Sequence, residues 1–457
     1  MPREPVVLIH GYSDKGESFT PWKQALVARG YQAEEIPVST YKSLTNEVTI
    51  KDIAEAFDRA LRTRANLGDG QPFDAIVHST GILVIRSWLT TYPARRDRLK
   101  RLVGLAPATF GSPLAHKGRG FLGAVFKGNK AIGPDFLEAG DQVLDGLELA
   151  SRFTWDLTHI DLLGEKPFYG KGSDTPYVFM FCGTDTYHGI RQLVNEAGTD
   201  GTVRWAGCSL TTQKFVVDFS RDDARKPGHR VTSTDIGASG VLPMPFFPVA
   251  GKNHATILGE PGDELVDLVH RALQVEDADG FDRWQADASQ RTRGALPAAQ
   301  WQQFIVRAVD ERGDPISDYH LELVVRGAAG EAPLEFDLDV HVYAKDSSLR
   351  CFHVDIVELQ KAIAKAGGGA VWARVIASSG SALVGYHGIN SEKLSPDLQV
   401  MNPDGVWDAQ IEIPTELGPS GIKFLFPFTT TFIELRLNRD PRPFGAVAND
   451  VCEFLAI

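Results

Sequence analysis

Cysteine is scarce in this chain of 457 residues, and the positions of its cysteines exclude several kinds of site. The four are Cys182, Cys208, Cys351 and Cys452, with no C-x-x-C pair among them. Such wide spacing is typical of buried free thiols, and it argues against a disulfide framework, a redox motif or a zinc finger. We therefore expect no cofactor and no metal ion in the site.

Long apolar runs are also missing. No stretch of the sequence is long and apolar enough to cross a bilayer. The first residues, Met-Pro-Arg-Glu-Pro, pass directly into an apolar strand and leave no room for a signal peptide. The expected location is therefore cytoplasmic, with export by a route that reads no signal peptide as the alternative.

Positive charge is in deficit, since the chain carries a net charge of -12 at pH 7. That balance argues against nucleic acid or a broadly anionic membrane surface as the main partner, although it permits a local basic patch. Transient contact with a membrane or lipid interface stays open as a further expectation. An apolar content of 43% and a charged content of 23% are those of an ordinary globular protein. The length indicates two or three domains.

The first part of the chain alternates between buried strands and amphipathic helices. This pattern predicts an α/β domain over 1–273, built on a doubly wound, mostly parallel sheet with its functional groups at the carboxyl ends of the strands. A long insertion at about 113–174 is expected to form a helical cap, and its alternative is a packed structural excursion. The expected strands are 6–9, 35–39, 73–78, 101–106 and 177–182.

The second part has a different period. Residues 274–300 are polar and alanine-rich without a clear period, and we interpret them as a linker. From about 301 to 457, apolar and polar residues alternate in short runs separated by turn residues. This indicates an all-β sandwich of about seven or eight strands, an accessory domain with an unknown protein partner. Its apolar stretch 422–428 is either a core strand or an exposed patch.

One corner in the first domain has the features of a nucleophile. Ser79 lies between the strand 73–78 and an apolar helix, and Gly81 follows two positions later. A sharp strand-to-helix turn lifts a serine hydroxyl clear of the backbone and places it at a helix N-terminus. The usual G-x-S-x-G pattern is incomplete, because Val77 stands where the first glycine is expected.

Three further stretches, in order, make the chain similar to the lipase and esterase branch of the α/β-hydrolase superfamily over about residues 5–273. The strand 6–9 followed by His-Gly-Tyr resembles the oxyanion loop, so the resemblance assigns the oxyanion hole to the N–H groups of Tyr12 and Thr80. Asp-Gly-Thr-Val at 200–203 resembles the element that carries the acid, and the loop around His254 resembles the one that carries the base.

The resemblance implies a catalytic triad of Ser79, His254 and Asp200. Asp185 is the alternative acid, because it directly follows a strand, where many other members carry theirs. We expect His78, next to the nucleophile, to point away from the site and to pack.

The combined pattern predicts a serine carboxylester hydrolase that cleaves lipid-like acyl esters through an acyl-enzyme. The apolar cap and the residues Leu242, Met244, Phe246 and Phe247 before His254 favour an acyl chain as substrate. Two alternatives stay open. One is a phospholipase that acts as a secreted antibacterial or host-directed effector, and the other is a non-catalytic binding scaffold on a hydrolase fold.

Overall fold

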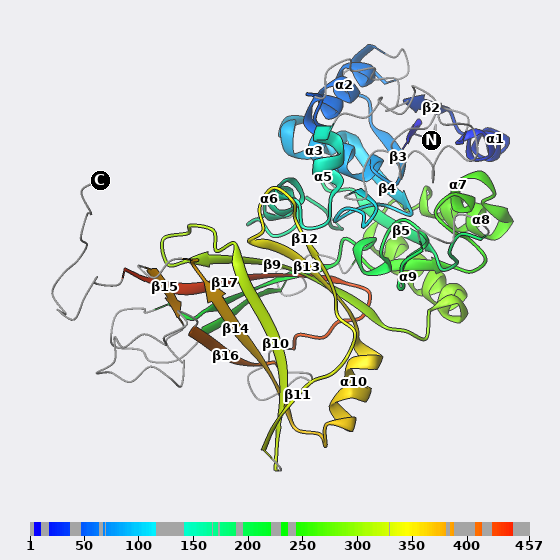
Figure 1. The fold of residues 1–457 in the computed structure, drawn as a ribbon. Coiled ribbons are helices and arrows are strands. Elements are labelled where there is room, and N and C mark those ends of the chain that lie inside the picture. The colour runs from blue at the N-terminus through cyan, green and yellow to red at the C-terminus, as the bar shows by residue number, and fades with distance from the viewer. Residues whose placement is uncertain are drawn as a thin grey trace, which may run out of the picture. The chain divides into compact units, whose positions relative to one another are not determined.

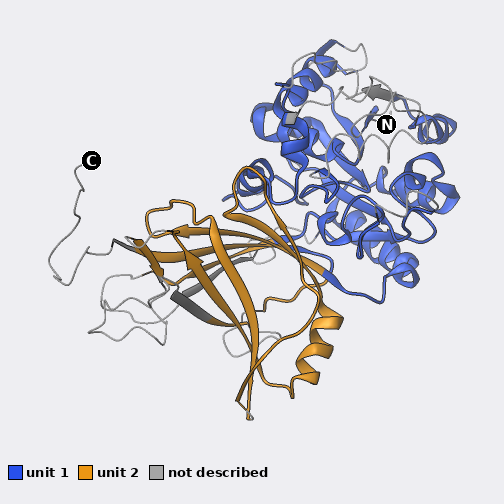
Figure 2. Cartoon of the chain, in the orientation of Figure 1, with its two compact units in different colours: residues 1–212, 235–301, 428–430 blue, residues 213–234, 302–427, 431–457 orange. Residues whose placement is uncertain are grey.

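The computed structural model describes residues 4–10, 18–36, 47–63, 67–68, 70–115, 141–166, 168–171, 174–188, 195–220, 230–235, 244–328, 330–380, 384–387, 407–413 and 423–441. The chain forms two compact units (Figure 2). Unit 1 comprises Met1–Thr212, Asp235–Trp301 and Phe428–Thr430, and unit 2 comprises Gln213–Thr234, Gln302–Pro427 and Thr431–Ile457. No helix within these described ranges is long and apolar enough to cross a membrane.

Unit 1 is built on a six-stranded sheet in the order β2-β1-β3-β4-β5-β8, with every recorded neighbour pair parallel (Figure 1). The apolar runs in β1, β3 and β5 are buried along their whole length, as strands covered on both faces must be. This confirms the predicted α/β class. The strands are β1 Val6–Ile9, β2 Ala33–Ile36, β3 Phe73–His78, β4 Leu99–Leu105, β5 Tyr177–Gly183 and β8 Phe246–Val249.

Helices cover this sheet, and α2 shows how an apolar helix face is buried. In α2, Ile50, Ile53, Phe57 and Leu61 recur at helical spacing and are all buried. The helices of unit 1 are α1 Thr20–Ala28, α2 Ile50–Thr63, α3 Gly81–Thr91, α5 Asp141–Leu147, α6 Arg152–Asp161, α7 Thr256–Gly259, α8 Gly262–Ala272 and α9 Ala278–Thr292. Short 3-10 turns are η2 Pro93–Arg98, η6 Trp205–Gly207 and η7 Arg293–Ala295.

The predicted cap falls partly outside the described residues, which omit 116–140. Its described remainder contains α5 and α6, which pack against α2 and α3. A fully buried ion pair ties α6 to α3, because Arg86 donates from Nε and Nη2 to the carboxylate of Asp161, at 2.8 Å each. Two hydrogen bonds from one buried guanidinium to one carboxylate fix the position of the two groups relative to each other. This part of the insertion is therefore anchored to the helix behind Ser79, and its role as a cap stays a prediction.

The predicted linker is wrong in its central part, which forms helix α9 of unit 1. Asp277 caps the helix by accepting from Gly280 N at 2.6 Å. Phe281, Trp284 and Ala288 are buried at i, i+3 and i+7, a helical period that three apolar residues among many polar ones leave faint in the sequence. Trp284 packs on the sheet, with ring centroids at 4.5 Å from Phe179 and 5.0 Å from Phe247.

Unit 2 contains a four-stranded sheet, β11-β10-β14-β16, and a seven-stranded sheet, β12-β13-β9-β17-β6-β7 with β15 on β17 (Figure 1). Side chains of both sheets form one core, as in a β-sandwich: Val306, Leu435 and Leu437 from one, Val375 and Ile411 from the other. The elements are β6 Thr212–Asp218, β7 Arg230–Asp235, β9 Trp301–Asp310, β10 Asp318–Gly327, β11 Gly330–Pro333, β12 Asp339–Val342, β13 Leu349–Asp355, α10 Ile356–Lys365, β14 Ala370–Ser378, β15 Val384–His387, β16 Trp407–Ile413 and β17 Thr430–Pro441.

The all-β second part is confirmed, but it draws on more of the chain than expected. Strands β6 and β7 lie within the predicted first domain, 1–273, yet they pair in the larger sheet of the sandwich. In β6, Phe215 and Val217 are buried while their neighbours are partly exposed, the alternation of a half-buried strand. In the stretch 422–428, Phe424 and Leu425 are buried, and Phe424 stacks on Phe215 at 4.3 Å, which favours a core segment.

Candidate active site

Ser79 occupies a strained corner between β3 and α3. Its φ is +53°, in the left-handed region that a residue other than glycine rarely adopts. The corner is fixed on both sides, since Ser79 N donates to Leu105 O at 3.3 Å and Ser79 O accepts from Ala108 N at 3.1 Å. The serine predicted from the sequence therefore sits on a sharp turn at a helix N-terminus.

The two ends of the incomplete glycine motif have different physical constraints. A Cβ at Gly81 would lie 2.7 Å from Ile9 O and 3.1 Å from His10 O, so the end of β1 passes too close for any side chain. Val77, at the first position, is fully buried in β3 and its register partner in β4 is Gly104. The elbow thus requires glycine at 81 and accommodates valine at 77.

Thr80, whose N–H is one of the two predicted oxyanion donors, lies at the start of α3. The N–H groups that open a helix have no acceptor within the helix. In the described part of the chain, no backbone carbonyl accepts from Thr80 N, and the Thr80 hydroxyl is buried there without a hydrogen-bond partner. The second predicted donor, Tyr12, lies outside the described residues.

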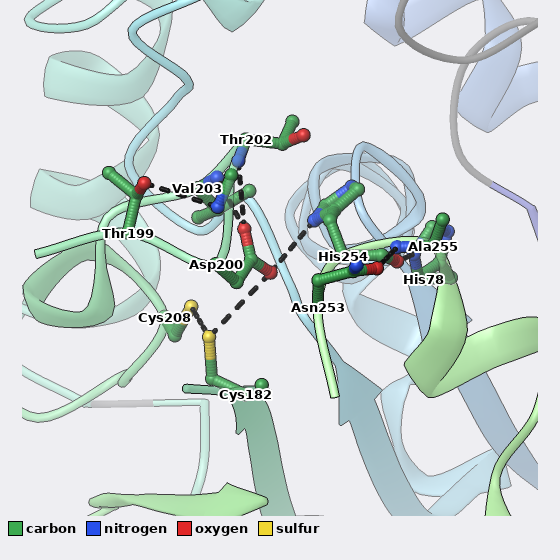
Figure 3. Close-up of polar contacts among 12 residues, drawn as sticks. His78, Cys182, Thr199, Asp200, Thr202, Val203, Cys208, Asn253, His254 and Ala255 are labelled. Atoms are coloured by element: carbon green, nitrogen blue, oxygen red, sulfur yellow. Dashed lines mark hydrogen bonds and ion pairs between the residues drawn. The ribbon is translucent and has the colours of Figure 1, made fainter. Parts of the chain in front are cut away.

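His254 and Asp200 form a buried pair (Figure 3). Nδ1 of His254 lies 2.9 Å from Oδ2 of Asp200, and both side chains are 0% exposed. A carboxylate only accepts, so Nδ1 carries the proton and Nε2 carries the lone pair that a general base uses. The backbone joins the same two residues, because His254 N donates to Asp200 O at 3.0 Å.

The loop around Asp200 explains the Asp-Gly-Thr-Val pattern (Figure 3). Oδ1 of Asp200 accepts from Thr202 N at 3.0 Å and from Val203 N at 2.8 Å. Gly201 has a φ of +96°, and a Cβ there would lie 2.6 Å from the ring of Tyr187. The glycine therefore permits the turn that presents two amides to one carboxylate oxygen.

Asp185, the alternative acid, lies elsewhere. Its backbone N donates to Lys252 O at 2.9 Å, which ties the end of β5 to the loop before His254. Its side chain is partly exposed and makes no hydrogen bond within the described ranges. Of the two candidate acids, Asp200 is the one that the fold brings to His254.

The expectation that His78 points away from the site is wrong. Its Nε2 donates to the backbone carbonyl of His254 at 2.9 Å, and the two imidazole centroids are 4.7 Å apart. A carbonyl only accepts, so Nε2 of His78 is protonated. Because His78 directly precedes Ser79, this contact brings the loop of the base to the elbow of the nucleophile. No local signal in the sequence marks a contact between residues 176 positions apart.

Three of the four apolar residues before His254 belong to the core of unit 1. Met244, Phe246 and Phe247 are buried, and the two phenylalanines belong to β8. Phe247 packs against Trp284 at 5.0 Å, and Phe246 against Phe428 at 5.2 Å. These side chains build the core of unit 1, while Leu242 lies outside the described residues.

Cys182 and Cys208 lie beside Asp200, which the wide cysteine spacing did not reveal. The thiols are buried, with Sγ atoms 3.1 Å apart, and Sγ of Cys182 lies 3.8 Å from Oδ2 of Asp200. Cys351 is a third buried thiol, and Cys452 lies outside the described residues. Across the described ranges, no three His, Cys, Asp or Glu side chains gather in a way that could hold a metal ion.

Comparison with known proteins identifies the fold. No protein-family model matches the chain, and no curated protein is similar to it in sequence. The parallel sheet, the elbow at Ser79 and the agreement with solved structures define an α/β-hydrolase fold with a β-sandwich, as the sequence predicted.

The structural similarity extends over the whole chain. Phospholipase PlaB from Legionella pneumophila matches with a TM-score of 0.76 at 23% identity, over 100% of this chain and 98% of that one. Its complex with thio-NAD gives a TM-score of 0.75 at 23% identity, over 99% and 97%. The mature form of the Bacillus licheniformis lipase BlEst2 covers 56% of this chain and 88% of its own, at 15% identity, and its TM-score of 0.35 is too low to support an argument.

Proposed function

We propose that this protein is a serine carboxylester hydrolase that cleaves lipid-like acyl esters, with phospholipids as the first substrates to test. One observation supports the proposal most directly: the buried Asp200 holds Nδ1 of His254 at 2.9 Å, and His78 ties the loop of His254 to the elbow of Ser79. Nucleophilic acyl transfer needs a base oriented by an acid, and here the loop of that base is tied to the elbow that carries the strained serine.

Each residue has a distinct role in this proposal. The hydroxyl of Ser79 attacks the ester carbonyl while Nε2 of His254 removes its proton. Asp200 keeps the imidazole in the tautomer with a proton on Nδ1, and it stabilises the imidazolium that forms. The N–H of Thr80 donates to the oxyanion, and the N–H of Tyr12 is the proposed second donor. One such donor typically contributes a factor of about 10²–10³ to kcat.

The second half of the reaction uses the same groups. His254 gives the proton to the departing alkoxide, which leaves as an alcohol. Ser79 then carries the acyl group as an ester. Water then loses a proton to Nε2 of His254 and attacks the acyl carbonyl. Collapse of that intermediate releases the carboxylic acid and restores the serine hydroxyl. The described residues that carry out both steps need no metal ion in this scheme.

Phospholipids come first among the proposed substrates. The neighbour that matches the full length of the chain is named a phospholipase, at an identity that supports the shared fold alone. We place phospholipids first for that reason, ahead of triglycerides and simple esters. Secretion of the enzyme as an antibacterial or host-directed effector is a separate proposal, which concerns where the enzyme acts.

The test compares the wild type with Ser79→Ala on three substrate sets: aryl esters of increasing acyl length, phospholipid vesicles and triglyceride emulsions. We expect hydrolysis that depends on Ser79, increases with acyl length and is greatest on the phospholipid. Equal hydrolysis by both proteins would contradict the role of Ser79. No hydrolysis of any substrate by the wild type would favour the non-catalytic scaffold.

A further inference from the structure

Two thiols form a hydrogen-bonded chain that ends on the proposed catalytic acid (Figure 3). Cys208 Sγ donates to Cys182 Sγ at 3.1 Å, and Cys182 Sγ donates to Asp200 Oδ2 at 3.8 Å. We propose that Cys182, backed by Cys208, is a positioning residue that sets how strongly Asp200 holds His254. This proposal rests on the proposed function, because it assigns Cys182 a role in the same reaction.

The carboxylate of Asp200 has hydrogen-bond donors on both oxygens. An ionised carboxylate has about four lone-pair sites, two on each oxygen. Thr202 N and Val203 N donate to Oδ1, while His254 Nδ1 and Cys182 Sγ approach Oδ2. The thiol therefore completes the set, and it shares one oxygen with the imidazole.

Both thiols are protonated in the folded protein. Burial strongly raises the pKa of Cys182, and the neighbouring Cys208 and Asp200 raise it further. Burial also raises the pKa of Cys208. Both groups therefore remain S–H at neutral pH, so Cys182 can donate to a carboxylate. The thiolate that peroxide or a disulfide attacks is scarce, which argues against a disulfide between the pair as their ordinary state.

The Cys182 thiol and the His254 imidazole compete for Oδ2 of Asp200. A donor on the same oxygen draws electron density from the carboxylate and weakens its hold on a protonated imidazole. When that donor is removed, Asp200 binds the imidazolium of His254 more tightly. The acidic limb of a pH profile, where the base must lose its proton, would then move to higher pH.

The other groups near Asp200 and His254 are the same in the wild type and in a Cys182 variant. Among the titratable side chains of the described residues, Cys182 contacts Asp200, His78 contacts His254, and Cys208 contacts Cys182. His78 contacts His254 from β3 and donates to its backbone carbonyl, so it acts on the imidazole independently of the thiols. A change confined to Cys182 therefore tests the thiol.

The chain offers a matched control in Cys351. Its thiol is also buried and forms no disulfide, and its Sγ lies 3.8 Å from an acceptor oxygen, Gln303 Oε1, within unit 2. Cys351→Ala removes the same atom from a comparable contact that has no link to Asp200. Any general effect of deleting a buried thiol appears in both variants.

The experiment compares Cys182→Ala, Cys182→Ser and Cys351→Ala with the wild type. One readout is kcat/KM against pH on an aryl ester, and the other is the low-field proton NMR signal of Nδ1–H of His254. We expect Cys182→Ala to lower kcat/KM at pH 7 about two- to fivefold, since the S–H is a weak donor. Its acidic limb should lie at higher pH than that of Cys182→Ser, and its Nδ1–H signal should move downfield.

The proposal is overturned if the pH profile and Nδ1–H signal of Cys182→Ala coincide with those of the wild type or of Cys182→Ser. Should Cys182→Ala fail to fold, Cys182→Ser decides: an upfield Nδ1–H shift, from a stronger hydroxyl donor, supports the proposal, and an unchanged signal overturns it. The NMR signal exists whether or not the protein hydrolyses esters. Failure of the proposed function is therefore seen separately, as wild-type activity that does not depend on Ser79.

Discussion

The imidazoles of His78 and His254 lie 4.7 Å apart, centroid to centroid, and a hydrogen bond of 2.9 Å from His78 Nε2 to His254 O joins them. The two residues come from the end of β3 and from the loop after β8. His78 thus connects the element that carries the proposed nucleophile to the loop that carries the proposed base. It is a positioning residue in this account.

This contact predicts a loss of turnover when it is removed. His78→Ala leaves the carbonyl of His254 without its donor and loosens the base relative to Ser79. We expect kcat to fall about tenfold with a smaller change in KM, because misplacement of a reacting group mainly affects the chemical step. His188→Ala, at an exposed histidine, is the control and should match the wild type. Equal kcat for both variants would refute the positioning role.

The two candidate acids can be separated by isosteric amides. In Asp200→Asn the amide can present NH2 to Nδ1 and favour the wrong tautomer of His254, so we expect kcat to fall by about 10³–10⁴. Asp185→Asn should stay within a few-fold of the wild type, because the described side chain makes no hydrogen bond to the histidine. The reverse pattern in steady-state kinetics would make Asp185 the acid.

The sequence predicts the α/β unit and the sandwich well because both follow from local periodicity. Val6–Ile9 and Phe73–His78 are mainly apolar runs that are stable only when they are buried. In α2 the apolar residues recur at helical spacing, so the sequence itself indicates which face of the helix is buried. The motifs at Ser79, Asp200 and His254 are also local, because each turn requires particular residues at neighbouring positions in the sequence.

The features that the sequence did not predict depend on distant contacts or on faint patterns. The direction of His78 is set by a loop 176 positions away, and the Cys182–Cys208 pair forms only when β5 meets the loop after η6. Helix α9 resembles a linker in the sequence because polar residues separate its three buried apolar ones. The unit to which strand β6 belongs cannot be predicted from its alternation, because alternation does not reveal which sheet a strand joins.

Helix α9 provides a stability prediction. Trp284 is buried against Phe179, Phe181 and Phe247, so Trp284→Ala leaves a large cavity on the sheet. We expect the free energy of unfolding of unit 1 to fall by about 3–5 kcal/mol in urea denaturation. Leu296→Ala, in the same segment but 47% exposed, is the control and should change it by less than about 0.5 kcal/mol. Similar small effects from both would indicate a linker after all.

Asp74 provides a prediction about pH and stability. Burial raises its pKa from 3.8 to about 7, although Arg101 donates to both carboxylate oxygens, at 3.1 and 3.2 Å. The folded state therefore binds a proton that the unfolded state has released, so stability decreases as pH rises from about 4 to about 7. The slope is at most about 1.4 kcal/mol per pH unit. Asp74→Asn should lack this part of the slope in urea titrations at several pH values, and an identical slope would contradict the assignment.

The central claim, that Ser79 is the nucleophile, is tested most directly by a fluorophosphonate probe, which reacts with activated serine hydroxyls. The wild type and Ser79→Ala are incubated with the probe, digested and examined by peptide mass spectrometry, with thermal denaturation to show that both are folded. The account predicts one adduct, on Ser79, and no adduct in Ser79→Ala. An adduct on another serine, or none in a folded wild type, would contradict it.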